Sequence, residues 1–132
     1  MLRPRVLADE RFIRATWLRA YRHVVRAPSD WYYAAQGALV SRLLAESETT
    51  VAHFPGDSDQ ILGYVVASGD VLHWVYTKGA FRRLGIASAL LDSALAERPR
   101  RATHWTDDAH EVGEKLGLVR DVAALLPQRA HA

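Results

Sequence analysis

The sequence of 132 residues contains no cysteine and no apolar run long enough to cross a bilayer. Without cysteine there are no disulfides, no thiolate zinc sites and no cysteine nucleophile. Charges interrupt the first ten residues, which therefore lack the apolar core of a signal peptide, and a cytoplasmic location is expected. Walker-type loops, Gly-x-Gly-x-x-Gly dinucleotide motifs and Gly-x-Ser-x-Gly elbows are also missing, so sites of those kinds are not expected.

Lysine is scarce as well, and arginine carries nearly all of the positive charge. The net charge of +2 is a mild excess that does not by itself imply a nucleic-acid partner. Seven arginines fall within the first 26 residues, where solvated helix faces are the favoured interpretation over a basic surface beside an anionic ligand. With 49% hydrophobic and 24% charged residues, the chain is predicted to form a single globular domain over residues 1–132.

The stretch 77–91 joins an apolar segment to an amphipathic one through a basic turn that contains glycine. Residues 71–77 are apolar and aromatic with β-branched members, which predicts a largely buried strand. Apolar residues then recur at three- and four-residue steps, which predicts a helix over residues 86–97 that ends before Pro99. A helix start exposes unpaired N–H groups and the positive end of the helix dipole. This junction is therefore suited to hold phosphate.

The rest of the chain changes between helical and strand periodicity. Three strands joined by short turns pair as an antiparallel meander, and a strand that follows a helix crossover lies parallel to the last of them. We therefore predict an α+β fold with a mixed, mostly antiparallel sheet and about four flanking helices. The expected elements are strand 2–7, a helix from Asp9 to about residue 25, a helix from Asp30 to about Glu46, strands 49–54, 61–67 and 71–77, helix 86–97, strand 102–106, a helix from 107 or 108 to about 116, and strand 119–126.

Motifs in two places resemble one known family. Residues 82–87, Arg-Arg-Leu-Gly-Ile-Ala, fit the Arg/Gln-x-x-Gly-x-Gly/Ala signature of the GCN5-related N-acetyltransferase (GNAT) superfamily. Phe81 and Leu90-Leu91 stand where that family usually has an aromatic residue and a Leu-Leu pair, and residues 106–118 agree in part with its Asn-x-x-Ala-x-x-x-Tyr-Glu-Lys-x-Gly-Phe segment. The resemblance implies the GNAT fold, whose sheet is splayed between its fourth and fifth strands. The alternative is an ordinary strand-to-helix turn with two solvated arginines.

The resemblance also implies acetyl-CoA as the cosubstrate. In this family pantetheine enters the gap beside the fourth strand and binds its backbone, a position that Val75, Tyr76 and Thr77 occupy here. A strand N–H near Tyr76 would polarise the acyl carbonyl. The backbone N–H groups that would take the pyrophosphate belong to Arg82, Arg83, Leu84, Gly85, Ile86 and Ala87.

The implied reaction moves the acetyl group to a primary amine of a small molecule or peptide, and it needs a base. Strand 71–77 contains no carboxylate, and His73 is its only residue that titrates near neutral pH, so His73 is the candidate catalytic residue. Strict alternation would place His73 on the face of Val75, opposite Trp74 and Tyr76. A histidine merely hydrogen-bonded within the sheet is an equal alternative.

Two further groups of side chains are candidates for binding. Trp31 and Tyr32 fall near the start of the second helix, which in this family borders the acceptor pocket, so they are candidate substrate-binding residues. Core packing is the alternative for at least one aromatic there. Residues 104–111 gather ligand-type side chains but lack the second histidine of a zinc helix, so a solvated helix cap is preferred and no metal site is expected.

The chain departs from the family near its end. Gly113 stands where many members have the tyrosine that protonates the leaving CoA thiolate, and only 15 residues follow Gly117. A partner chain in a homodimer would complete the sheet. One alternative follows, a CoA-binding module that has lost transfer activity. A second alternative rests on the N-terminal half, whose Trp-Leu-Arg-Ala-Tyr-Arg helix resembles small GNAT-like proteins of bacteriophages and implies a nucleic-acid-associated role.

Overall fold

A computed structural model describes residues 1–24, 30–69, 71–81, 85–94, 101–103 and 119–120. The described part contains three α-helices, two short 3₁₀ helices and six strands. The helices are η1 (Leu7–Asp9), α1 (Glu10–Val24), α2 (Asp30–Glu46), η2 (Gly79–Phe81) and α3 (Ile86–Ala94). The strands are β1 (Leu2–Pro4), β2 (Glu48–Phe54), β3 (Asp57–Ser68), β4 (Val71–Thr77), β5 (Arg101–Ala102) and β6 (Val119–Arg120).

The strands form one mixed sheet in sequence order, from β1 to β6. Strands β1 to β4 pair antiparallel. Tight turns join β2 to β3 and β3 to β4, which requires those two pairs to be antiparallel. Strand β5 pairs parallel to β4 after the crossover through α3, and β6 pairs parallel to β5. The predicted α+β class and the mixed, mostly antiparallel sheet are thereby confirmed.

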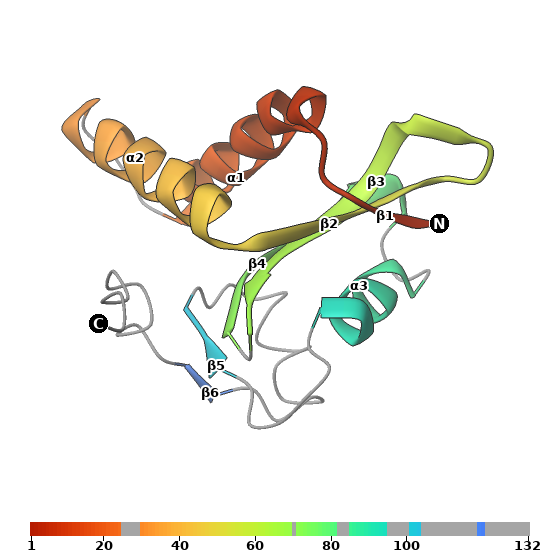
Figure 1. Ribbon diagram of the computed structural model, residues 1–132. Helices are drawn as coiled ribbons and strands as arrows, with labels where there is room; N and C mark the ends of the chain where they lie inside the picture. Colours follow the sequence, from red (N-terminus) through yellow and green to blue (C-terminus); the bar gives the residue numbers. More distant parts are fainter. Residues whose placement is uncertain (25–29, 70, 82–84, 95–100, 104–118, 121–132) are drawn as a thin grey trace.

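Helices α1 and α2 cover one face of the sheet, and α3 covers the other (Figure 1). Side chains alternate between these faces along β3: Tyr64 and Val66 point to α1 and α2, whereas Val65 and Ala67 point to α3. The upper cluster consists of Ile13, Trp17, Val40, Leu43, Leu44, Val51, Ile61, Tyr64, Val66 and Trp74. The lower cluster consists of Ala52, Val65, Ala67, Leu72, Leu90, Leu91 and Ala102.

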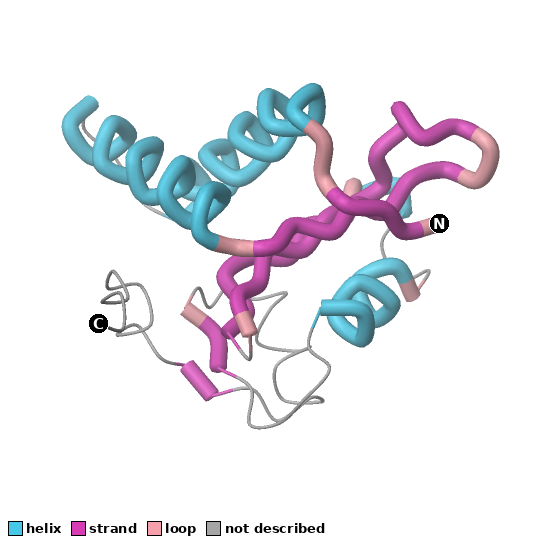
Figure 2. Tube along the Cα trace, viewed as in Figure 1, coloured by secondary structure: helices cyan, strands magenta, loops and turns pink. Residues whose placement is uncertain are grey.

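The N-terminal residues are hydrogen-bonded to the β2–β3 hairpin, at the end of the sheet opposite the β3–β4 turn (Figure 2). The Arg3 guanidinium donates to both oxygens of Asp9, at 2.6 and 2.9 Å, and to the carbonyl of Ser58 at 2.9 Å. Asp9 also accepts from the Val6 backbone N–H at 2.9 Å. The hydrogen bond from Arg3 lowers the pKa of the Asp9 carboxyl. Asp9 therefore ties β1 to the start of α1.

Element boundaries differ from the predicted ones in three places. The first strand ends at Pro4, and β3 begins at Asp57, because only residues 55–56 form the turn and Gly56 takes the positive φ of 83°. Helix α1 begins at Glu10, directly after Asp9, where the helix was expected to start, and the difference there is the 3₁₀ turn at residues 7–9. Residues 95–97 and 121–126 of predicted elements, most of strand 102–106 and the whole helix expected at 107–116 lie outside the described residues. No helix in the described ranges has the length and apolar character needed to span a membrane.

Candidate cofactor-binding site

Strand β4 contains a bulge at His73. Val66 of β3 pairs with Trp74, and the next residue, Ala67, pairs with Leu72, so His73 is an extra residue on β4. The bulge changes which face each side chain occupies: Leu72 packs in the lower cluster, whereas Trp74 packs in the upper one. The predicted placement of His73 on the face of Val75 relied on strict alternation, which the bulge interrupts.

The bulge also changes the direction of the backbone groups of β4. The carbonyl of Leu72 accepts from the N–H of Thr103, which follows β5, at 3.0 Å, while the N–H of Lys78 donates to Leu62 of β3 at 2.8 Å. Alternation back from Lys78 directs the backbone of Tyr76 to β3 and the backbones of Val75 and Thr77 to the β5 side. Of the three predicted pantetheine-binding residues, Val75 and Thr77 are thus the two whose backbone groups are directed to that side.

In the described part of the chain, pairing between β4 and β5 covers the beginning of β4. The paired residues are Val71 with Arg101 and Leu72 with Ala102. Val71 to Trp74 are buried, whereas Val75 to Thr77 are half-buried. Within the described residues, the first half of β4 is thus buried and paired with β5, whereas its second half is half-buried.

His73 directly follows Leu72, the last residue of β4 that is paired with β5 in the described part of the chain. Its side chain is only 4% exposed, and its Nδ1 is 2.9 Å from the Thr103 hydroxyl. Burial, with a smaller contribution from the charge of Arg42 on α2, lowers the pKa of His73 to about 4. A buried imidazole of this pKa is neutral at pH 7 and a weak base. These observations favour the interpretation of His73 as a histidine bonded within the sheet.

The aromatic ring of Tyr76 lies on the α1 side of the second half of β4. Its ring stacks on that of Tyr64, with centroids 5.4 Å apart, and meets Phe12 of α1 edge-on at 6.1 Å. The Lys78 ammonium group lies 5.2 Å from the centroid of the Phe12 ring. The side chain of Tyr76 is therefore held by packing above the strand, while its backbone belongs to the β3–β4 ladder.

The predicted phosphate turn leads directly into α3. Gly85 has a φ of 79°, a left-handed conformation that favours glycine, and its carbonyl accepts the first helical bond, from the N–H of Ala89 at 3.0 Å. Ile86 and Ala87 form the start of the helix, whose first turn carries no acidic side chain. The positive end of the helix dipole is therefore not neutralised there. Arg82, Arg83 and Leu84 lie outside the described residues.

The predicted acceptor-binding residues are only partly described. Trp31 and Tyr32 lie in the first turn of α2, at the opposite end of that helix from β2. Their side chains lie outside the described part of the structure. Gly113 and the ligand-type cluster at 104–111 lie outside it as well, and the described residues contain no group of three or more side chains suited to a metal.

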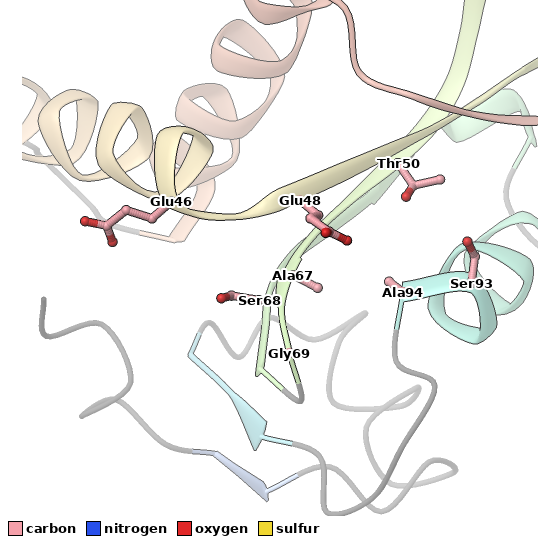
Figure 3. A pocket seen from close by; sticks show the side chains of 8 residues that line it. All are labelled: Glu46, Glu48, Thr50, Ala67, Ser68, Gly69, Ser93 and Ala94. Carbon is pink, nitrogen blue, oxygen red and sulfur yellow. The ribbon is translucent and has the colours of Figure 1, made fainter. Parts of the chain in front are cut away.

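A cavity of about 350 Å³ opens at the other end of α3 (Figure 3). Two carboxylates border it, and it lies beside the last residues of α3, whereas the phosphate turn precedes the first. A nine-residue helix separates the two places by about 13 Å. The negative charge of the two carboxylates makes the cavity unsuited to pyrophosphate. The lining residues are Glu46, Glu48, Thr50, Ala67, Ser68, Gly69, Ser93 and Ala94.

Sequence reasoning missed the bulge and one glycine. Gly63 pairs with Thr77, and a Cβ on it would lie closer to the Tyr76 carbonyl oxygen than van der Waals radii allow. A glycine inside the apolar run of residues 61–67 was the available signal, because such a glycine often marks a bulge or the close approach of another backbone.

Comparison with known proteins identifies the fold. The chain matches no family model and no curated protein sequence. A GCN5-related N-acetyltransferase from Rhodopseudomonas palustris matches 87% of this chain over 78% of its own, with a TM-score of 0.61 and 18% identity. A GNAT family acetyltransferase from Brucella melitensis, in complex with acetyl-CoA, matches 86% of this chain over 80% of its own, with a TM-score of 0.55 and 21% identity.

AAC(6')-Iy, in complex with the bisubstrate analog CoA-S-monomethyl-acetylneamine, matches all of the chain over 98% of its own, with a TM-score of 0.53 and 14% identity. Such identities show the fold and leave the substrate open. The parallel β4–β5 pair and the turn into α3 thus belong to a GNAT fold, the fold of the GCN5-related N-acetyltransferases.

Proposed function

We propose that the protein transfers an acetyl group from acetyl-CoA to a primary amine of a small molecule or peptide. The observation that carries this proposal is the half-buried second half of β4, followed by a helix start whose first turn has no acidic residue. Solved structures with this fold include one in complex with acetyl-CoA and one with a CoA-linked bisubstrate analog.

The cosubstrate would extend along these two features. Backbone groups of Val75 and Thr77 would bind pantetheine, and the N–H groups at Gly85, Ile86 and Ala87 would bind pyrophosphate, together with the preceding Arg82, Arg83 and Leu84. A negatively charged diphosphate is stabilised at that position by the helix dipole and by unpaired N–H groups.

In the reaction, the neutral amine nitrogen attacks the thioester carbonyl carbon. A C–N bond forms, the C–S bond breaks, the amine loses a proton, and CoA leaves as the thiol after taking up a proton. Holding the amine and the thioester together supplies much of the barrier reduction, roughly 7 to 11 kcal/mol in well-oriented reactions. Transfer therefore does not depend on His73 acting as the base, and water can accept the proton.

A CoA-binding protein without transfer activity is the second candidate. The observation in its favour is His73, the only group of β4 that titrates near neutral pH, which is buried and has a low pKa. Both candidates predict cosubstrate binding, and only the first predicts an acetylated product.

Binding is tested by thermal denaturation with acetyl-CoA. A ligand that binds only the native state stabilises it by RT ln(1 + [L]/Kd), which is about 2.7 kcal/mol at one hundred times Kd. We expect acetyl-CoA to raise the melting temperature of the parent protein. Gly85→Glu should abolish this shift, because it places a carboxylate at the phosphate position. Gly37→Glu, the same substitution in α2, is the matched control and should keep the shift.

No shift at millimolar acetyl-CoA would refute cosubstrate binding, and a full shift in Gly85→Glu would remove the phosphate role of the turn. Mass spectrometry of a panel of amines, with CoA thiol release measured in parallel, separates the transferase from the inactive module. The phage-type hypothesis has its own test, DNA binding that weakens steeply with salt. The homodimer and the cytoplasmic location stay predictions.

A further inference from the structure

At Gly63, the backbone of β4 leaves no room for a side chain on β3. A Cβ built on Gly63 would overlap the carbonyl oxygen of Tyr76 and would lie 3.3 Å from the Cα of Thr77. Both contacts are with the backbone of β4, so no change of side-chain rotamer can relieve them. Any side chain at residue 63 must therefore move a strand.

The surroundings decide which strand moves. Strand β3 lies between β2 and β4, and Gly63 itself pairs with Ala52 on β2 and with Thr77 on β4. The following residues, Tyr64 and Val65, are fully buried in opposite clusters. The end of β4 is less enclosed, because Val75 to Thr77 are half-buried. The end of β4 is therefore the part that would yield, away from β3.

We propose that Gly63 is a positioning residue, which sets the place of residues 75–77 and so holds the backbone groups of Val75 and Thr77 where acetyl-CoA binds. This inference rests on the proposed function. Gly63 itself acts from the strand behind β4, and it acts through the absence of a side chain.

The test is the affinity for acetyl-CoA, measured by titration calorimetry at a temperature where circular dichroism shows each variant folded. Gly63→Ala should raise Kd by about tenfold or more, as expected for the loss of one or two backbone hydrogen bonds. Gly37→Ala should leave Kd within about twofold of the parent value, since a Cβ at Gly37 meets nothing within 4 Å. Leu43→Ala, a buried truncation on α2, controls for destabilisation alone.

An unchanged Kd in Gly63→Ala would overturn this inference alone, and so would an equal loss of affinity in Leu43→Ala. Absence of binding by the parent protein would overturn the proposed function and this inference with it. If Gly63→Ala does not fold, the double variant Gly37→Ala/Gly63→Ala replaces it, because alanine stabilises the interior of α2. Failure of both to fold would overturn the inference, because Gly63 would then be required for the whole fold.

Discussion

The two halves of β4 belong to one strand but have different neighbours. Residues 71–74 are buried between helices on both faces and are joined to β5 by backbone pairing and by the contact from His73 to Thr103. Residues 75–77 are half-buried and, within the described residues, have β3 as their paired strand. The difference suits one strand to two purposes: its first half stabilises the sheet, and its second half is where we propose that acetyl-CoA binds.

The largest expected effect is on stability, from a truncation in the first half. Trp74 is 7% exposed and stacks on Trp17, with ring centroids 5.4 Å apart. Trp74→Ala should lower the free energy of unfolding by about 3 to 5 kcal/mol, because it removes this contact and leaves a cavity. Val75→Ala, one residue along, should cost about 1 kcal/mol because Val75 is half-buried. Urea denaturation followed by circular dichroism measures both, and equal losses would contradict the comparison.

The next effect is on the pH dependence of stability. The pKa of His73 is lowered to about 4 in the folded protein, from an ordinary value of 6.5. Between these values the unfolded chain binds more protons, so stability is full above pH 6.5 and decreases as the pH falls toward 4. The loss is on the order of 3 kcal/mol.

Replacing the titrating group is the control for this pH effect. His73→Asn keeps a polar atom near the position of Nδ1 but cannot titrate, so its free energy of unfolding should vary less with pH between 4 and 6.5. Denaturation curves at several pH values give both slopes. Identical slopes in the parent and in His73→Asn would show that other groups cause the dependence.

The smallest effect is expected at the contact that joins β4 to the residue after β5. Thr103→Val removes the hydroxyl that lies 2.9 Å from His73 Nδ1 and leaves that nitrogen without this partner. The free energy of unfolding should fall by about 1 to 3 kcal/mol. Thr50→Val, a hydroxyl removal on the half-buried rim of β2, should change it by less than about 0.5 kcal/mol. A loss at residue 103 no larger than at residue 50 would show that the contact between His73 and Thr103 does not stabilise the protein.

Most of the fold could be predicted from the sequence, because hydrophobic periodicity is a local property. The strand at residues 71–77 was predicted with its observed bounds, and the order of elements implied the parallel β4–β5 pair. The bulge at His73 could not be predicted, since it depends on the register between strands and not on the composition of either one. The burial of His73 agrees with the largely buried strand that the sequence predicted, and its contact with Thr103 agrees with the alternative of a histidine hydrogen-bonded within the sheet.

The candidate site could be predicted in outline only. Its turn is written in consecutive residues, and Gly85 has the backbone conformation that its residue type suggests. The direction of backbone groups along β4 depends on pairing with β3 and β5, which no local pattern encodes. For this reason the sequence indicated Val75, Tyr76 and Thr77 together, whereas the hydrogen bonds separate Tyr76 from the other two.

The parallel connection between β4 and β5 has an entropic consequence. Strands β3 and β4 close through a turn of a few residues, but the contact from His73 to Thr103 joins residues 30 apart. Closing a longer loop loses more chain entropy. On β5, the described contacts with β4 that offset this loss are two backbone-paired residue pairs. Among the described contacts, release of β5 from β4 would break two residue pairs and reopen this long loop, while the β2–β3–β4 meander remains intact.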